Sequence, residues 1–407
     1  MPKAMDVDLT VSPAKGNTEV PVSPPEIMDK TKSLLERITS HLGLLDSGDG
    51  SQTLTVVDRA TADLRRGLPV YVAEPGGESY LVIAAEAVDN GSLKRLKAAS
   101  AESVDPLLVL TGPRSAAVGL SDGTNPTYIV TCASSMDESI IGFLSDPLSD
   151  FPAPPDASKL NILPGHRLSN ASVKLTKIAR LIPSVVAVKA TPTPGILSVS
   201  VEDIEAYDNT AGSSLRMVSQ ARVPLEDAEN ARIVAFRPRD GGVEHLAIVI
   251  GEPDINEPVL IRLHSECFTG DLLGSLRCDC GSQLRGAISE IAQTGSGILL
   301  YLAQEGRGIG LINKLRAYQL QDSGLDTVEA NLHIGYDMDE RVYLPAAQML
   351  KLMGISRVKL MTNNPLKMTA LGRFGIEMTE RVPHIFPSNM HNQGYLKTKA
   401  AKSGHLL

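Results

Sequence analysis

The sequence predicts an α/β (α+β) protein of two domains, each of which combines strands with helices. The chain has 407 residues, which is more than one ordinary domain holds. Hydrophobic residues make up 43% and charged residues 21% of the chain, as is typical of a globular protein. Short apolar segments alternate with segments of helical spacing along most of the length, and this is the pattern of strands and helices packed in layers.

Residues 1–50 are expected to form a mobile tail. Residues 1–25 contain five prolines and no sustained periodicity. Ile27 to Leu45 has helical spacing and is predicted to form an appended helix, followed by a linker with the composition DSGDGSQ.

Residues 51–205 are expected to form the first domain. A proline-rich stretch at residues 150–158 interrupts its pattern, as a surface loop would. Its apolar segments are LPVYVA, SYLVIAAEAV, PLLVLT, TYIVTCA, SVKLTKIARLI, SVVAVKA and ILSVSV.

Residues 206–407 are expected to form the second domain. The predicted strands are RIVAFRP, HLAIVIGE, PVLIRLHSE, SGILLYLA and SRVKLMT. The predicted helices are GLINKLRAYQLQDSG, LPAAQMLKLMG and the segment after TNN, in which Asn364 can cap the helix and Pro365 suits its first position. Strand, turn and helix repeated in this way predict a mixed or parallel sheet with helices over it. In the first of these helices, one face is predicted to carry Leu311, Ile312, Leu315 and Tyr318 or Gln319.

Charge and hydropathy exclude several classes of function. A net charge of −8 and a pI near 5.6 argue against a general nucleic-acid binder, although a local cationic pocket for one anionic small molecule remains compatible. No apolar run approaches the ~18 residues of a membrane span, and the N-terminus lacks the apolar core of a signal peptide. We therefore expect a cytoplasmic protein that binds neither nucleic acid nor membrane.

The four cysteines indicate a metal site more than a disulfide framework. Cys267, Cys278 and Cys280 fall close together, whereas Cys132 stands alone in an apolar context and is predicted to be a small buried hydrophobic residue. Clustered thiols in a reducing compartment are typical of metal ligands or a redox site.

Three sulfurs form an incomplete tetrahedral zinc set. Cys278 and Cys280 are two residues apart, so on an extended segment both thiolates face the same side. His264 either completes a closed structural site, or the fourth position stays open for water, which is the mark of catalytic zinc. The absence of two C-x2-C pairs favours catalytic over structural zinc, with a metal-free cluster as a further alternative.

Two other segments are candidates for binding an anion, and a third could set an acid–base group beside a cation. QEGRGIG (residues 304–310) lies between a strand and a helix, where glycines and Arg307 suit a phosphate, or it is an ordinary turn. TNNPLK (residues 362–367) offers Thr362 and Lys367 at a second such junction, or merely a solvated lysine. DMDER (residues 337–341) sets an acid beside an arginine, or is a solvated acidic loop.

Taken together, the motifs of the second half resemble those of GTP cyclohydrolase II. They are RLHSECFTGDLLGSLRCDCGSQL, YLAQEGRGIGLINKLRAYQLQDSGLDTVEAN, DERVY, LMTNNPLKMTAL and NQGYLKTKAAKSGHLL, and they span roughly residues 217–405. The resemblance implies opening of the imidazole ring of GTP in riboflavin biosynthesis. The implied products are formate, pyrophosphate and 2,5-diamino-6-ribosylamino-4(3H)-pyrimidinone 5′-phosphate.

The resemblance also implies residue roles. Zinc would be held by Cys267, Cys278 and Cys280, which removes His264 from the ligands. Asp339 matches a proposed proton acceptor and Arg341 a proposed nucleophile toward the α-phosphorus, although electrostatic stabilisation by Arg341 explains its presence equally well. The residues that match GTP contacts, including a tyrosine near the guanine, are Arg262, Leu263, His264, Ser265, Glu266, Gln283, Glu305, Gly306, Arg307, Tyr318, Thr327, Thr362 and Lys367.

The implied chemistry accounts for these residue types. Zinc would supply hydroxide to C8, cationic side chains would offset the triphosphate charge, and Mg²⁺ is expected on the pyrophosphate. Val342 departs from the family, many members of which carry an acidic residue there. The family is typically dimeric, so a homodimer is expected.

The first half more faintly resembles 3,4-dihydroxy-2-butanone 4-phosphate synthase, through ATADLRRGLPVYVAE, YLVIAAEAV and LPGHRL. Where that enzyme needs an acidic run for magnesium, this chain has EPGGESY (residues 74–80), with only Glu74 and Glu78. Its G-H-T-E segment is replaced around Ser169 to Val173 by SNASV. We therefore expect the first domain to be inactive and to serve a structural role, either covering a face of the cyclohydrolase or supporting dimer formation.

Three alternatives remain open at this point. The first is a bifunctional enzyme that also acts on ribulose 5-phosphate. The second is a GTP-binding regulator with structural zinc, and the third is a relative that acts on another purine nucleotide. The lost acidic run opposes the first, and the retention of Asp339 with Arg341 opposes the second.

Overall fold

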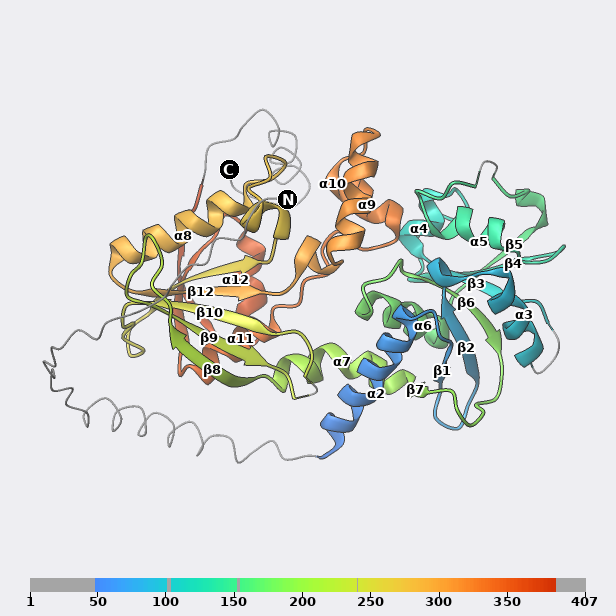
Figure 1. Cartoon of the computed structure of the whole chain (residues 1–407), viewed down its shortest axis with the longest axis horizontal. Helices are drawn as coiled ribbons and strands as arrows, with labels where there is room; N and C mark the ends of the chain where they lie inside the picture. Colours follow the sequence, from blue (N-terminus) through green and yellow to red (C-terminus); the bar gives the residue numbers. More distant parts are fainter. Residues whose placement is uncertain (1–47, 101–103, 152–153, 240, 386–407) are drawn as a thin grey trace, which may run out of the picture. The chain divides into compact units, whose positions relative to one another are not determined.

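The computed structural model describes residues 48–100, 104–151, 154–239 and 241–385 (Figure 1). These described residues belong to one compact unit. The helix expected within residues 27–45 and the C-terminal motif from Asn392 lie outside the described residues. Two mixed seven-stranded sheets with helices packed on them confirm the α/β (α+β) fold class (Figure 1). Across the described ranges, no helix combines the length and apolar character that crossing a membrane requires.

The first sheet has the strand order β5-β4-β3-β6-β2-β1-β7. Neighbouring strands are antiparallel except β1 and β7, which are parallel. Six of the strands lie on apolar segments named for the first domain, whereas β5 was not among them and most of SVKLTKIARLI forms part of a helix. The bounds are β1 Val70–Ala73, β2 Ser79–Ala84, β3 Leu107–Thr111, β4 Thr127–Cys132, β5 Leu160–Pro164, β6 Ser184–Lys189 and β7 Ser198–Ser200.

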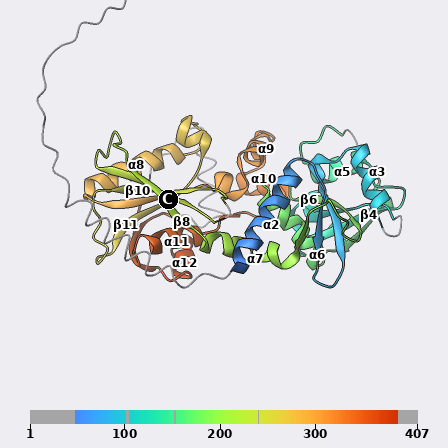
Figure 2. The same ribbon diagram turned by 60° about the horizontal axis from the view of Figure 1, so that its bottom comes forward.

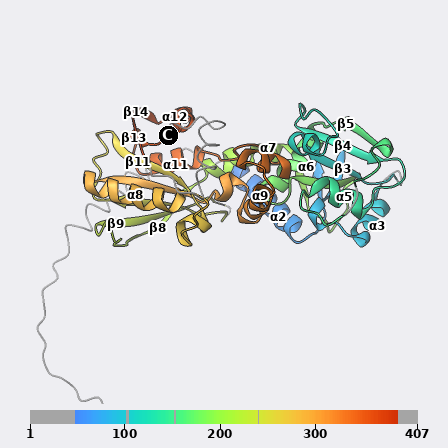
Figure 3. The same cartoon turned by 90° about the horizontal axis from the view of Figure 1, so that it is seen from above.

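Helices cover both faces of the first sheet (Figure 3). The apolar sides of α2 (Gly48–Arg65), α6 (Arg167–Ile178) and α7 (Val201–Ser213) share one core with the strands. The helices α3 (Asn90–Ala99) and α5 (Glu138–Ser145) share the other core, and the short α4 (Gly112–Ala117) follows β3.

The beginning of α2 corrects the predicted linker. Residues 48–52 form its first turns although their composition is typical of a loop. Val57, Ala60 and Leu64 are buried in the core shared with the first sheet, and this packing stabilises a helix that its glycines alone would disfavour. Cys132 is half-buried at the end of β4 and packs against the edge of a core, so it is less buried than predicted.

The second sheet has the strand order β14-β13-β11-β12-β10-β9-β8, in which the first four strands are parallel and the others antiparallel. The predicted mixed sheet is therefore confirmed. The bounds are β8 Arg216–Arg222, β9 Ala231–Arg237, β10 His245–Ile250, β11 Val259–Ser265, β12 Gly297–Leu302, β13 Arg357–Met361 and β14 Glu377–Val382.

Helix α8 (Cys280–Thr294) packs on one face of this sheet, and α11 (Leu344–Leu352) with α12 (Pro365–Gly372) packs on the other (Figure 2). Pro365 is the first residue of α12, as predicted. Helix α7 crosses the predicted domain boundary at residues 205/206 without a break.

The helices α9 (Leu311–Asp322) and α10 (Thr327–Ile334) share a small core of their own. The face predicted to be shared along α9 is not the buried one, since Ile312 and Leu315 are 61% and 45% exposed. The face that points inward carries Asn313 and Lys314 instead. Their polar groups are all paired by hydrogen bonds, which is what makes burial of such side chains tolerable.

The buried His245 predicts a pH dependence of stability. Burial, and then the positive charge of Arg180, lowers the pKa of His245 to about 4, and its neutral Nδ1 accepts a hydrogen bond from the Ala303 N–H at 3.1 Å. Because the folded protein binds a proton here less readily than the unfolded chain does, the stabilisation is complete above the unfolded-state pKa near 6.5. It is lost as the pH falls from 6.5 towards 4. We expect a loss of about 2 kcal/mol between pH 7 and pH 5, measured by urea unfolding. A His245→Asn variant should lack this component, and an unchanged pH slope in that variant would contradict the assignment.

Candidate functional site

The candidate site lies where three parallel strands end. β11 ends at Ser265, β12 at Leu302 and β13 at Met361, and each strand is followed by one of the motifs singled out in the sequence. Crevices form at the carboxyl ends of parallel strands because the connections diverge there towards opposite faces of the sheet. One pocket at this edge collects residues from all three connections.

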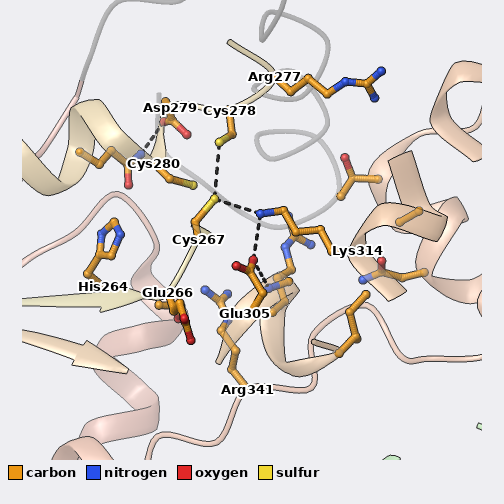
Figure 4. A pocket seen from close by; sticks show the side chains of 18 of the residues that line it. His264, Glu266, Cys267, Arg277, Cys278, Asp279, Cys280, Glu305, Lys314 and Arg341 are labelled. Carbon is orange, nitrogen blue, oxygen red and sulfur yellow. Dashed lines mark hydrogen bonds and ion pairs between the residues drawn. The ribbon is translucent and has the colours of Figure 1, made fainter. Parts of the chain in front are cut away.

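The three clustered cysteines converge at one corner of this pocket (Figure 4). The Sγ atoms of Cys267 and Cys278 are 3.7 Å apart, and all three Sγ atoms lie within 4.8 Å of one another. Tetrahedral zinc with Zn–S bonds of about 2.3 Å requires sulfurs about 3.8 Å apart, so the cluster fits zinc. Among the described residues no fourth His, Cys, Asp or Glu joins the group.

Cys278 and Cys280 converge for a different reason from the one predicted. Cys280 is the first residue of α8 and not part of an extended segment. The helix forms because apolar residues at helical spacing, from Leu284 to Ile291, pack on the second sheet. A helix N-terminus stabilises a thiolate through the helix dipole, so this corner suits an anionic ligand set.

A buried polar network shapes the loop that carries Cys267. The carboxylate of Asp271 accepts hydrogen bonds from the Cys267 N–H at 2.9 Å and the Tyr301 hydroxyl at 3.0 Å. It also lies 3.0 Å from Nε2 of His264, which stacks on Tyr301. His264 is thus paired with a carboxylate.

Gly270 leaves room for the sulfurs. A Cβ at this position would lie 2.8 Å from Cys278 Sγ and 3.0 Å from both Cys267 Sγ and the Cβ of Cys280. We therefore expect Gly270→Ala to reduce the zinc content of the purified protein severalfold, because the sulfurs must move apart from tetrahedral spacing. Zinc is measured by inductively coupled plasma mass spectrometry, with Gly372→Ala on α12 as control, since a Cβ there meets nothing within 4 Å and its backbone is not left-handed. Full zinc occupancy in Gly270→Ala would contradict this role.

The buried Lys314 was missed by the sequence analysis. Its Nζ lies 3.1 Å from Cys267 Sγ, 2.9 Å from Thr269 Oγ1 and 2.8 Å from Glu305 Oε1 (Figure 4). Burial alone would lower the pKa of Lys314, but the Glu305 carboxylate and the Cys267 thiolate raise it. The only sequence signal was a lysine one turn into the helix that follows the glycine-rich turn, and such lysines are usually solvated.

The thiols themselves favour a cation. Hydrogen bonds from Cys278 and Cys280, and then the charge of Lys314, lower the pKa of the Cys267 thiol. The resulting thiolate raises the pKa of the other two thiols. A divalent ion removes this conflict because it stabilises all three thiolates together.

Cationic side chains line the rest of the pocket. Arg262 is buried and donates to the Met361 carbonyl at 2.8 Å and to Gln283 Oε1 at 2.6 Å. Its Nε has no hydrogen-bond partner in the described part of the chain. Lys367 is also buried and lies 3.3 Å from the carbonyl oxygen of Leu263. Such a wall suits a polyanionic ligand.

The glycine-rich turn presents Arg307 through a strained backbone. Gly306 and Arg307 both have φ near +64°, and this conformation is uncommon for a non-glycine residue. Strain of this kind persists where the surroundings enforce it, and it marks candidate functional sites. Glu305 lines the same pocket, but its carboxylate is held by Lys314 and by the N–H groups of Phe268 and Gly306.

Asp339 and Arg341 form an ion pair beside the pocket. The guanidinium of Arg341 donates from Nε to Asp339 Oδ1 at 2.8 Å and from Nη2 to Oδ2 at 2.5 Å. Burial alone would raise the pKa of Asp339, but Arg341 lowers it below the ordinary value. Arg341 lines the pocket and Asp339 does not, so Asp339 meets the pocket only through its partner.

The predicted binding residues and zinc ligands all line this single pocket. Tyr318 lies on α9 beneath the guanidinium of Arg277, and Thr327 is the first residue of α10. The carbonyl of Val342 accepts a hydrogen bond from Gln304 Nε2 at 2.6 Å. Polar lining residues that the sequence analysis missed are Arg277, Asp279, Lys314, Gln321, Asn331 and Asn363.

Comparisons with known proteins agree with the geometry. Residues 216–383 match the family model of GTP cyclohydrolase II. GTP cyclohydrolase-2 of Azospirillum brasilense is 48% identical over 365 residues, which cover 87% of this chain and 94% of the relative. GTP cyclohydrolase-2 of Xylella fastidiosa is 34% identical over 88% of both chains. The riboflavin biosynthesis protein RibBA of Cytophaga hutchinsonii is 42% identical over 60% of this chain and 63% of the relative.

A solved structure of RibBX from A. baumannii is described as a two-domain 3,4-dihydroxy-2-butanone 4-phosphate synthase. It is 17% identical, covers 81% of this chain and 99% of that chain, and has a TM-score of 0.30, a similarity too weak to bear on the fold. The relative from Azospirillum brasilense, in contrast, is matched over nearly its whole length. The cluster of three cysteines, the cationic pocket and these relatives lead to one conclusion: the chain belongs to the GTP cyclohydrolase II family.

Proposed function

We propose that the pocket at the ends of β11, β12 and β13 binds GTP and opens its imidazole ring, as a GTP cyclohydrolase II of riboflavin biosynthesis. The products are formate, pyrophosphate and 2,5-diamino-6-ribosylamino-4(3H)-pyrimidinone 5′-phosphate. The observation that carries the proposal is that a zinc-sized cluster of three thiols faces the same pocket as the cationic side chains. Such a site accommodates a nucleotide with its base near the metal and its phosphates near the cations.

Residues of this chain have distinct parts in the reaction. Zinc, when bound by Cys267, Cys278 and Cys280, supplies a water of lowered pKa. The guanidinium groups of Arg262, Arg307 and Arg341 and the ammonium of Lys367 offset negative charge on the phosphates. Mg²⁺ would enter with the triphosphate.

Asp339 is proposed to accept a proton. Arg341 lowers the pKa of Asp339, so the Asp339 carboxylate is ionised at neutral pH and can accept a proton. Arg341 keeps its positive charge throughout. The same ion pair orients the Arg341 guanidinium towards the pocket that it lines.

Turnover of GTP tests the proposal. Purified, zinc-replete protein is incubated with GTP and Mg²⁺, and formate, pyrophosphate and the pyrimidine product are followed by mass spectrometry. All three products are expected in equal amounts. GTP binding without turnover would overturn the enzymatic proposal and favour the regulatory alternative, and turnover of another purine nucleotide alone would favour an altered substrate.

The first sheet and its helices are proposed to be inactive as a lyase. Glu78 is exposed and ion-paired with Lys189, and the turn at residues 74–77 contains no further carboxylate beyond Glu74. His166 lies 3.0 Å from the Tyr80 hydroxyl, so it is engaged within the domain. Ribulose 5-phosphate should therefore remain unchanged in a parallel incubation, and its conversion would establish a bifunctional enzyme.

We also propose a cytoplasmic homodimer. The thiolate ligands need a reducing compartment. The loop after Cys267 exposes large apolar side chains, with Leu272 70%, Leu273 65% and Leu276 59% exposed, which a second copy would cover. Light scattering after size-exclusion chromatography should give twice the chain mass, and a monomer of unchanged mass would refute the dimer.

A further inference from the structure

The end of α6 contacts both loops that carry the charged residues of the GTP site. Helix α6 packs on the first sheet, yet Lys177 in its last turn and Arg180, two residues after its end, bond to groups on the connections of the second sheet. We propose that the segment Lys177–Ile182 is a positioning element for the GTP site, with Lys177 as the residue that holds the loop of Asp339 and Arg341. The inference rests on the proposed roles of those two residues.

Lys177 clamps the loop from both sides of Asp339. Its Nζ lies 2.6 Å from Glu340 Oε1 and 2.9 Å from Asp337 Oδ2. The side chains of Lys177 and Glu340 are each 21% exposed, so water screens this pair less than a surface pair. Glu340 Oε1 also accepts the Asp337 N–H at 2.8 Å, so one carboxylate closes the loop and joins it to Lys177.

The same loop is bonded to the glycine-rich turn. The N–H of Glu340 donates to the Arg307 carbonyl at 3.1 Å, and Arg307 Nη1 donates to the Met338 carbonyl at 3.3 Å. A shift of Glu340 would therefore move Arg307 as well as Asp339 and Arg341. Neither carboxylate that the Lys177 ammonium contacts lines the pocket. Lys177 therefore acts through Glu340, whose N–H bonds to Arg307.

Arg180 supports the glycine-rich turn from the other direction. It has φ of +58°, one of two non-glycine residues with positive φ among those described. In this conformation its Nη2 donates to the Ala303 carbonyl at 2.9 Å, two residues before Glu305. Its own carbonyl accepts from Asn313 Nδ2 at 2.9 Å, and a Cβ on Gly310 would lie 3.1 Å from its Cδ. The strained backbone is therefore held by contacts with the site.

The remaining residues of the segment fix it in place. The Leu181 carbonyl accepts the Tyr336 hydroxyl at 2.5 Å, immediately before the Asp337–Arg341 loop. The Ile182 N–H donates to Glu86 Oε2 at 2.8 Å, within the first sheet's own helices. The segment is anchored at one end in the first sheet and bonded at the other to the site, which gives a domain without lyase chemistry a part in the cyclohydrolase reaction.

Substitution of Lys177 tests the proposal in the full chain. Lys177→Met keeps most of the side chain and removes the ammonium. We expect kcat for formate release to fall about tenfold, with KM for GTP within about twofold, because misplaced groups that act in the transition state cost kcat more than binding. Zinc content should be unchanged. Lys177→Arg should restore most of kcat, since it can span to the same carboxylates.

Lys174 provides the matched control, one turn earlier on α6. Its ammonium pairs with Asp208 at 3.1 Å and bonds to the Glu205 carbonyl at 3.0 Å, both on α7. Lys174→Met removes an equivalent ion pair without touching the site and should leave kcat unchanged. Equal kcat in Lys177→Met and the wild-type chain, or equal losses in the two lysine variants, would overturn the proposal.

Two further variants decide the outcome if Lys177→Met also lowers the melting temperature. In Glu340→Gln, added to Lys177→Met, the two losses should not add, because both remove one interaction. Arg180→Gly removes the bond to Ala303 while its φ suits glycine, and kcat should fall severalfold without loss of stability. Additive losses together with full activity of Arg180→Gly would refute the proposal. Wild-type protein that fails to convert GTP would instead refute the proposed function.

Discussion

Replacement of Cys278 by serine is expected to remove zinc and to lower formate release from GTP by on the order of 10³-fold or more. Cys278 Sγ is 3.7 Å from Cys267 Sγ, and zinc needs both as thiolates. A serine hydroxyl remains protonated at neutral pH, so it cannot complete the set. The loop itself should persist because Asp271, Tyr301 and the N–H of Cys267 hold it without using Cys278.

Zinc content, formate release and melting temperature are measured together for Cys278→Ser. Cys132→Ser is the matched control, since Cys132 lies at the end of β4 and outside the thiol cluster, and it should keep both zinc and activity. Retained turnover in a zinc-free Cys278→Ser protein would remove zinc from catalysis. Loss of the fold together with the metal would instead show that the zinc is structural.

Replacement of Arg341 is expected to have the next largest effect. Arg341→Ala should lower kcat about 10²- to 10³-fold, because it removes a charge that stabilises the phosphates in the transition state and leaves Asp339 without its partner. Arg341→Lys should recover part of this loss, since an ammonium keeps the charge but not the two-pronged geometry. Recovery by lysine is expected for an electrostatic role.

Intact-protein mass spectrometry during turnover distinguishes the two roles of Arg341. An electrostatic role leaves the mass of the wild-type chain unchanged, whereas a covalent role adds a nucleotidyl group that Arg341→Lys lacks. Arg237→Ala is the control, because Arg237 is an exposed arginine on β9 paired with Glu244. Full activity of Arg341→Ala would exclude both roles.

Much of the fold and the pocket followed from the sequence because the signals were local. The strands β9 to β13 are rich in apolar residues, and Pro365 marks the beginning of α12. The motifs follow strand ends, so their convergence could be inferred from the rule that parallel strands collect crevices at their carboxyl ends. The resemblance then supplied residue roles that spacing alone left open.

The remainder depended on tertiary packing. The composition before Thr53 is that of a loop, but contact with the first sheet makes it helical. Lys314 and Asn313 can be buried because each has hydrogen-bond partners from other parts of the chain or the preceding turn. The periodicity of apolar residues does not reveal such partners. The contacts of Lys177 join positions more than 150 residues apart, and no local pattern encodes such a pairing.

The unbroken course of α7 has a practical consequence for dividing this protein. Val201 and Ile204 at its beginning belong to the core of the first sheet, whereas Gly212 near its end lies so close to Leu344 of α11 that a Cβ there would be 2.9 Å from that side chain. One rod of helix thus has its two ends embedded in different hydrophobic interiors. A gene fragment beginning at residue 206 would start in the middle of this helix. If such a truncated protein were unstable or inactive, the cause would be the cut through α7 and not the loss of the lyase-like domain.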